Sequence, residues 1–227
     1  MLVLAMDTSG CVLSVVLARD GVILGEVVEE TRNRHSAVLM ARTSGLLADC
    51  GVVPEDLELV AVASGPGTYT GVRVGVTVAK SLAFALGIPL VGMSSLEILA
   101  RASNGMGVIV AMMDARRESV FGGAYDVEGN VLVDDGHYGL ADFLERVMVF
   151  GRDGLTFVGD GAIAYEDQIL EACSGSEFRV VSRLEQSLAS VMVGMIPGRE
   201  MVQDVHGFVP EYLRVTEAEA NLESVDG

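Results

Sequence analysis

The stretch from Ser64 to Pro89 most constrains what this chain can fold into. It opens with Gly65-Pro66-Gly67, which is typical of a sharp turn that exposes backbone N–H groups. An unbroken apolar run follows, until Gly87 and Pro89 provide a stop signal. Valines at alternate positions favour a strand, but the run is too long for an ordinary strand and continues at helical spacing. We therefore predict a glycine loop followed by one helix.

Small residues predict a packing face on this helix. They recur every fourth position, at Gly71, Gly75, Ala79 and Ala83. A glycine inside a helix costs roughly 1 kcal/mol relative to alanine, so such a stripe indicates close approach of another backbone. A second helix, predicted from His35 to about Cys50, has a similar face at Ala37, Ala41 and Gly45. The two helices could pack on each other, on a second copy, or on a different protein.

Two polar residues of these helices have alternative interpretations. His35 could be a ligand, a base or a helix-start residue, and the lack of a second histidine nearby favours the structural role. Arg73 lies near the start of its helix, where the helix dipole disfavours a cation. It either points to solvent or meets an anion.

Composition narrows the class of protein. The chain has 227 residues, of which 50% are hydrophobic, so it can build one large or two small cores. Its three cysteines contain no Cys-x-x-Cys pair, which predicts a reducing, cytoplasmic environment without a zinc ribbon or disulfide framework. No basic region precedes Asp7, and Arg73 and Lys80 interrupt the longest apolar run, so we expect no membrane association.

The net charge of −17 disfavours direct binding of nucleic acid, because an acidic surface repels phosphates. We therefore expect no broad direct binding of nucleic acid without a basic partner. Solubility alone is the simpler explanation of the charge.

The order of predicted elements indicates an internal duplication. Three strands, over 2–6, 12–18 and 22–29, form a meander, and the first ends at Asp7. Val108 to Asp114 repeats that opening and is followed by strands over 119–125 and 131–134. The second half continues with helices over 141–149, 163–173 and 184–195 and strands over 155–158 and 178–181.

Three loops at strand ends could hold an anion: Asp7-Thr8-Ser9, Gly65-Pro66-Gly67 and Gly159-Asp160-Gly161. The first places a carboxylate beside hydrogen-bond donors, which suits a phosphate with its metal ion. A simple turn is the alternative for the first and third loops, and for the first loop a turn with a capping aspartate is favoured. The second loop is not a Walker loop, because no Gly-Lys-Ser/Thr follows it.

These motifs together resemble the TsaB (YeaZ) family, over nearly the whole chain and most strongly over residues 1–125. The resemblance rests on Asp7-Thr8-Ser9, His35-Ser36, Gly65-Pro66-Gly67-x-x-Thr70-Gly71-x-Arg73-x-Gly75, Gly87-Ile88-Pro89, Ser94-Ser95-Leu96, Asp114-Ala115-Arg116-Arg117, Gly159-Asp160-Gly161 and Tyr212-Leu213-Arg214. Members are bacterial subunits required for threonylcarbamoyladenosine in tRNA.

The resemblance implies an α/β fold of the actin, sugar-kinase and Hsp70 (ASKHA) type, made of two ribonuclease-H-like βββαβα lobes. We expect lobes at 1–103 and 104–227, the latter smaller and with a partly disordered tail. It also implies a heterodimer with the paralogue TsaD, a larger complex with TsaE, and a homodimer when the chain is alone. The expected partner-binding residues are His35, Ala37, Ala41, Gly45, Gly71, Arg73, Gly75, Ala79 and Ala83.

One departure from the TsaD relatives concerns the metal. Where they carry His-x-x-x-His, this chain has Ser95 and Leu99, which cannot hold it. We expect no metal, no catalytic residue and no cofactor, with ATP only at the interface of an assembled complex. A vestigial or weak nucleotide site is expected at Asp7, Thr8, Ser9, Gly65, Gly67, Gly159 and Asp160.

Three functions remain open at this point. The first is a non-catalytic subunit that binds and activates TsaD in forming N6-threonylcarbamoyladenosine at position 37 of tRNAs. The second is a self-sufficient small-molecule kinase or ATPase of the same fold, with Asp7 or Asp114 near the phosphates. The third is a homodimeric interaction module.

Overall fold

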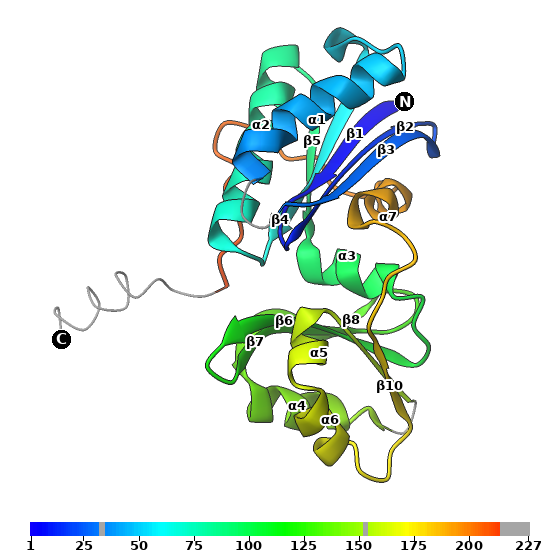
Figure 1. Cartoon of the computed structure of the whole chain (residues 1–227), viewed down its shortest axis with the longest axis vertical. Helices are drawn as coiled ribbons and strands as arrows, with labels where there is room; N and C mark the ends of the chain where they lie inside the picture. The colour runs from blue at the N-terminus through cyan, green and yellow to red at the C-terminus, as the bar shows by residue number, and fades with distance from the viewer. Residues whose placement is uncertain (32–34, 152–153, 214–227) are drawn as a thin grey trace, which may run out of the picture.

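Each half of the chain builds a five-stranded mixed sheet, and the two sheets form the two lobes in Figure 1. The computed structural model describes residues 1–31, 35–151 and 154–213. The first half contains β1 (Leu2–Asp7), β2 (Val12–Arg19), β3 (Val22–Glu30), α1 (His35–Asp49), the short 3-10 helix η1 (Pro54–Asp56), β4 (Leu59–Gly65), α2 (Tyr69–Leu86), β5 (Leu90–Ser94) and α3 (Ser95–Ala102). Its strand order is β3-β2-β1-β4-β5, with β1 antiparallel to β2 and parallel to β4.

The second half repeats this plan. It contains β6 (Val108–Arg116), β7 (Ser119–Tyr125), β8 (Val131–Gly139), α4 (Leu140–Met148), β9 (Leu155–Val158), α5 (Asp160–Ala164), α6 (Glu166–Ala172), β10 (Phe178–Val181) and α7 (Leu188–Met195). Read from β8, the strand order β8-β7-β6-β9-β10 matches that of the first sheet position by position. Strand β6 is antiparallel to β7 and parallel to β9, as β1 is to β2 and β4. The predicted duplication and fold class are confirmed.

Two helix predictions in this half were too long. The helix predicted over 163–173 is broken at Tyr165, whose φ of −116° leaves the helical range, and it becomes α5 and α6. The helix predicted from residue 184 begins only at Leu188, where the Ser187 hydroxyl caps it by accepting a hydrogen bond from the Ser190 amide.

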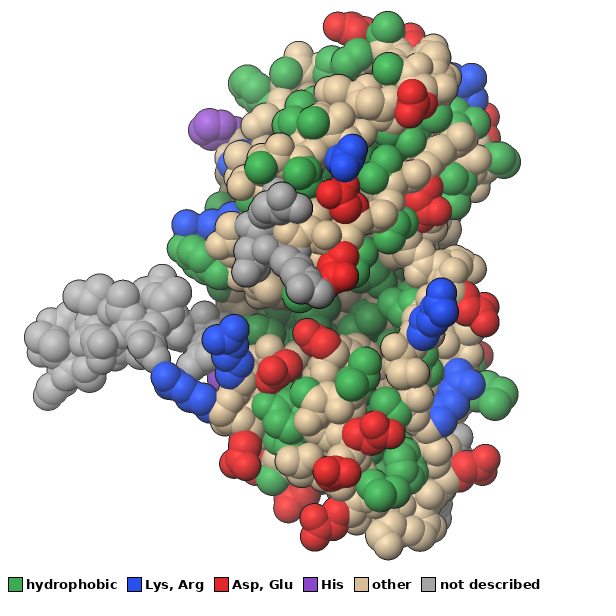
Figure 2. Space-filling view, in the orientation of Figure 1, with side chains coloured by type: hydrophobic (Ala, Val, Ile, Leu, Met, Phe, Trp, Pro, Cys, Tyr) green, Lys and Arg blue, Asp and Glu red, His purple; other side chains and the backbone are tan. Residues whose placement is uncertain are grey.

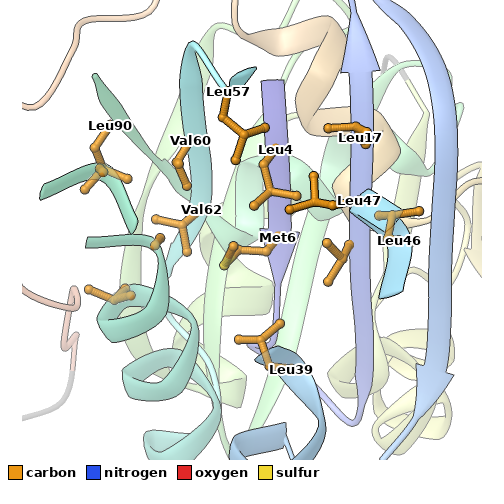
Figure 3. Packing of buried hydrophobic residues seen from close by; sticks show 14 of the residues in the cluster. Leu4, Met6, Leu17, Leu39, Leu46, Leu47, Leu57, Val60, Val62 and Leu90 are labelled. Carbon is orange, nitrogen blue, oxygen red and sulfur yellow. The ribbon is translucent and has the colours of Figure 1, made fainter. Parts of the chain in front are cut away.

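The core of the first lobe lies between its sheet and helices α1 and α2. Figure 3 shows Leu4 and Met6 of β1 pointing toward Val62 of β4 and toward leucines of α1, and all of these side chains are buried. Each such aliphatic side chain contributes about 1.5–3 kcal/mol to stability when fully buried.

Within the described residues, no helix has both the length and the hydrophobicity needed to cross a bilayer.

The two halves exchange their last helices. Helix α3 of the first half packs on the second sheet, where Leu96 and Leu99 join a core cluster with Ile109 and Ala111. Helix α7 of the second half packs on the first sheet, where Met192 joins a cluster that contains strand residues of β1, β2 and β4. The two exchanged helices also contact each other. Each sheet is therefore covered on one face by the other half of the chain.

The end of the described chain also returns to the first lobe. The Val202 amide donates to the Leu90 carbonyl over 2.8 Å, and Phe208 packs against the first-lobe core. The expected boundary between residues 103 and 104 therefore does not match the packing, because α7 and the segment after it lie on the first sheet. The acidic tail from Glu217 onward lies outside the described residues.

The small-residue stripe of α2 faces the interior of its own lobe. Gly71, Gly75, Ala79 and Ala83 are all buried. A Cβ atom on Gly71 would lie only 2.1 Å from the Thr8 carbonyl oxygen, and the Thr8 hydroxyl donates to the Gly71 carbonyl over 2.7 Å. The prediction that these four residues contact a partner is wrong, because the stripe serves the approach of α2 to the end of β1.

Replacement of Gly71 by alanine should destabilise the protein. The new methyl group would meet backbone that cannot move away as a side chain can. We expect a loss of about 1–3 kcal/mol in the free energy of unfolding, the usual penalty of overpacking. Urea unfolding measures it. Gly45→Ala on α1 is the matched control: nothing lies within 4 Å of its Cβ position, so a gain of up to about 1 kcal/mol from helix propensity is expected. Equal stability of the two variants would contradict this account.

Candidate partner surface and anion-binding loops

The Asp7 turn and the Gly65 loop lie together, as their positions at the ends of neighbouring parallel strands predict. They are packed directly on each other. The Thr68 amide donates to the Ser9 carbonyl over 2.7 Å, and a Cβ atom on Gly67 would lie 2.5 Å from the same oxygen. Their backbones are therefore hydrogen-bonded to each other and in close contact.

The segment near the end of the described chain closes the loop from another side. The Glu211 amide donates to the Ser64 carbonyl over 2.8 Å. A Cβ atom on Gly65 would lie 2.5 Å from the Glu211 carbonyl oxygen. Gly65 is needed here both for its φ of 119° and for this close contact.

Asp7 is fully enclosed beneath these loops, with 1% of its surface exposed. One carboxylate oxygen accepts from the Ser9 amide over 2.6 Å, while the other, like the Ser9 hydroxyl, has no hydrogen-bond partner among the described residues. Burial raises the pKa of the Asp7 carboxyl above its usual value, and the Ser9 hydrogen bond and the nearby His35 oppose this rise only in part. The Asp7 carboxylate is therefore enclosed by the chain itself and is not exposed to solvent.

The second lobe repeats this packing at Gly159. A Cβ atom there would lie 2.1 Å from the Met112 carbonyl oxygen, and Gly161 also abuts the end of β6. The Asp160 carboxylate accepts from the Asp114 amide over 3.1 Å, and burial raises the pKa of Asp160. In both lobes, therefore, the loop at the start of a helix packs against the end of the first strand of the sheet.

His35 and the two positions that replace the relatives' metal ligands are also interior. His35 is 3% exposed; its Nδ1 accepts from the Thr31 hydroxyl over 2.8 Å, and its Nε2 donates to the Gly10 carbonyl over 2.9 Å. The prediction that it binds a partner is wrong, and the helix-start interpretation holds. Ser95 and Leu99 are buried in α3. In the part of the chain that the structure describes, no three His, Cys, Asp or Glu side chains gather into a metal-binding group.

The small residues of α1, in contrast, are exposed. We call the exposed residues of this helix that are small or apolar the α1 outer face: Ala37, Met40, Ala41, Ser44, Gly45 and Ala48. Helix α2 lies beside α1 (Figure 1) and adds an exposed row, the α2 ridge: Thr70, Arg73, Thr77 and Ser81. Neither surface carries a carboxylate. The sequence-predicted partner residues that remain available are therefore Ala37, Ala41, Gly45 and Arg73.

Two tyrosines, Tyr69 and Tyr212, hold Arg73, a role that the sequence did not predict for either of them. Its guanidinium carbon lies 4.1 Å from the centre of the Tyr69 ring, and its Nε donates to the Tyr212 hydroxyl. The two rings are stacked with centres 5.6 Å apart. Among the described residues, Arg73 thus meets aromatic rings rather than an anion. The motif at Tyr212 was the available signal, and its last residue, Arg214, lies outside the described residues.

Known proteins resemble this chain in sequence. A family model described as "TsaD: tRNA N6-adenosine threonylcarbamoyltransferase" matches residues 21–222. The chain is 38% identical, over 97% of its length and 97% of the relative's, to the tRNA threonylcarbamoyladenosine biosynthesis protein TsaB of Bacillus subtilis. The chain belongs to the TsaB family. The Escherichia coli TsaB is 31% identical over 57% of this chain and 57% of its own length.

Solved structures agree with the TsaB family fold. YeaZ from Pseudomonas aeruginosa has a TM-score of 0.72 at 25% identity and covers 93% of this chain and 99% of its own. A ROK hexokinase from Thermus thermophilus, at 14% identity and a TM-score of 0.50, covers 85% of this chain and 96% of its own and supports the sugar-kinase type of fold alone.

Acidic residues outnumber basic residues in this TsaB-family chain, 32 to 15. Figure 2 shows Asp and Glu side chains spread over both lobes and a hollow between the lobes that is floored by hydrophobic side chains. With a net charge of −17, no broad cationic surface is expected that could follow a nucleic acid backbone.

The buried Asp7 predicts a specific pH dependence of stability. Because its pKa is raised in the folded chain, the folded state holds more protons than the unfolded state above about pH 4, and stability falls as the pH rises through the folded pKa. Asp7→Asn keeps the acceptor for the Ser9 amide and never ionises. The variant should be more stable than the wild type at pH 7, by about 1.4 kcal/mol for each unit of pKa difference between the folded and unfolded chain.

Urea unfolding between pH 4 and pH 8 measures this difference, which should shrink as the pH falls. Asp167→Asn, at an exposed position of α6, serves as control and should track the wild type. A wild type more stable than Asp7→Asn at neutral pH would show that the ionised carboxylate is favoured in the fold.

Proposed function

We propose that the chain is a non-catalytic subunit in threonylcarbamoyladenosine formation on tRNA, and that it binds and activates a TsaD-type catalytic subunit. The observation that carries the proposal is the α1 outer face. Its small side chains let another helix approach closely, and no described part of the chain covers it. The name of the Bacillus subtilis relative and the transferase family model supply the pathway.

The sequence similarity between this chain and the TsaD family supports the proposed geometry of the heterodimer. Because the TsaD model matches this chain over most of its length, the catalytic partner has a first lobe of the same kind. Two related chains can pair through equivalent helices about a pseudo-twofold axis, as identical chains do about a true one. The same surface serves a homodimer when the chain is alone, and partner binding replaces that homodimer. A TsaE-type ATPase completes a larger complex in the cytoplasm.

The packing of the loops supports a non-catalytic role. The Asp7 and Gly65 loops are closed by their own backbones, and Ser95 and Leu99 offer no metal ligands where the TsaD relatives carry histidines. Activation then acts through the partner, whose helices are held in one arrangement. ATP belongs to the interface of the assembled complex, and RNA contact is left mostly to the other subunits, consistent with the acidic surface.

The partner proposal predicts the effect of a bulky residue on the α1 outer face. Ala41→Trp should weaken association with the cognate TsaD-type subunit at least about tenfold, equivalent to about 1.4 kcal/mol, because the helices can no longer approach. Ala172→Trp, at an exposed site on α6 of the second lobe, should bind as the wild type does. Light scattering after size exclusion, with titration calorimetry, measures both variants and the homodimer. A wild type that does not associate with the partner would refute the proposal.

The alternative, a self-sufficient kinase or ATPase, rests on the three loops at strand ends. The closed loops predict that the purified chain binds ATP with Mg²⁺ only weakly, with a dissociation constant of about 1 mM or higher, and turns none of it over alone or with small hydroxyl compounds. Calorimetry and a phosphate-release assay test this, with the assembled complex as positive control. Turnover by the chain alone that is lost in Asp7→Asn would favour the alternative.

A further inference from the structure

The arrangement around Arg73 suggests a specific anchor within the partner surface. Two tyrosines from different parts of the chain fix the position of the guanidinium: Tyr69 at the start of α2, and Tyr212 near the end of the described chain. The aromatic rings hold the plane of the group, and the hydrogen bond from Nε to Tyr212 holds its rotation. A guanidinium fixed in this way loses little further freedom when it binds an anion.

The anchor has unused hydrogen-bonding capacity. Only Nε of Arg73 has an acceptor among the described residues, so both terminal nitrogens are available. These two nitrogens form the fork that binds a carboxylate or a phosphate in a bidentate manner. All three side chains are exposed, Tyr69 to 52% and Tyr212 to 44%.

We propose that Arg73 receives a carboxylate of the TsaD-type partner and that Tyr212, from the C-terminal segment, is the positioning residue that orients it. This inference rests on the proposed function. Its consequence is that the partner surface is composite: it includes the α1 outer face, the α2 ridge, and a side chain that reaches α2 only because the end of the chain folds back on the first lobe.

Three observations favour a protein carboxylate over a phosphate of nucleic acid or nucleotide. Arg73 lies in one row with Thr77 and Ser81 beside the α1 outer face, so a subunit that covers this face also covers Arg73. A desolvated guanidinium left without an acceptor is strongly destabilising, so the covering subunit must supply one. The net charge of −17 opposes a polyanion at long range but does not prevent a single carboxylate from pairing at contact.

The test uses the full chain and its cognate TsaD-type subunit, with the dissociation constant measured by calorimetry. Arg73→Gln should weaken association about 10- to 100-fold, in the range seen when one member of a paired charge is removed. Arg73→Lys should restore only part of the loss, because an ammonium group cannot make the bidentate contact. Tyr212→Phe keeps the stacked ring but loses the hydroxyl, and should weaken binding about 3- to 10-fold. Arg146→Gln, on α4 of the second lobe, is the control and should have no effect.

Two further measurements separate the explanations. Unfolding in urea shows whether each variant keeps the stability of the wild type, as expected for exposed residues. Repeating the titrations at rising salt should show a smaller salt dependence for Arg73→Gln than for the wild type, because one ion pair is missing. A purely structural role of Arg73 would leave that salt dependence unchanged.

The possible failures are distinct. If the wild type does not bind the partner, the proposed function and this inference both fall. If the wild type binds and Arg73→Gln binds equally well, the inference alone is overturned. If Arg73→Gln binds the partner normally but loses affinity for inorganic phosphate or tRNA, Arg73 is a phosphate receptor and the carboxylate assignment is wrong.

Discussion

The direct contact between helix α2 and the Thr8 backbone is the interaction on which the first lobe depends. Because Gly71 has no side chain, the helix starts against the end of β1, and the reciprocal hydrogen bond from the Thr8 hydroxyl fixes the distance. Gly75, Ala79 and Ala83 continue the approach along the sheet. The larger side chains of α2 point in several directions: Val72 and Val76 are buried in the core with strand residues, whereas Arg73 and Phe84 are exposed. The position of Arg73 on the outside follows from the position of Gly71 on the inside.

The same contact has a chemical consequence. In a fold that can hold phosphate between strand-end loops, space between the Asp7 turn and the glycine loop would be needed for an anion. Here the Ser9 carbonyl receives the Thr68 amide, and Glu211 covers Gly65. The exchange of α3 and α7 between the halves adds a second restraint, because each sheet is covered by a helix of the other half. Opening the loops would therefore disturb packing in both lobes rather than move one surface segment.

The strands and their duplication were predictable because hydrophobic patterning and turn residues are local signals. The repeated strand ending in aspartate, at Asp7 and Asp114, was enough to establish the repeat. The direction of a small-residue stripe was not predictable, because glycine permits close approach without specifying which backbone approaches. The stripe on α2 turned inward and that on α1 outward, although both have the same spacing. Tyr212 lies 139 residues from Arg73 in sequence, and no local pattern links residues that far apart.

The close packing of the Asp7 and Gly65 loops and the exposed face of α1 both follow from the way α2 packs on its sheet. Helix α2 packs closely on its own sheet, and its neighbour α1 lies beside it with the small residues outward. If the Asp7 and Gly65 loops could move apart, catalysis and partner binding would both depend on helix α2. In this chain the buried glycines favour the rigid surface, which is the property a subunit needs if it acts by holding another protein in place.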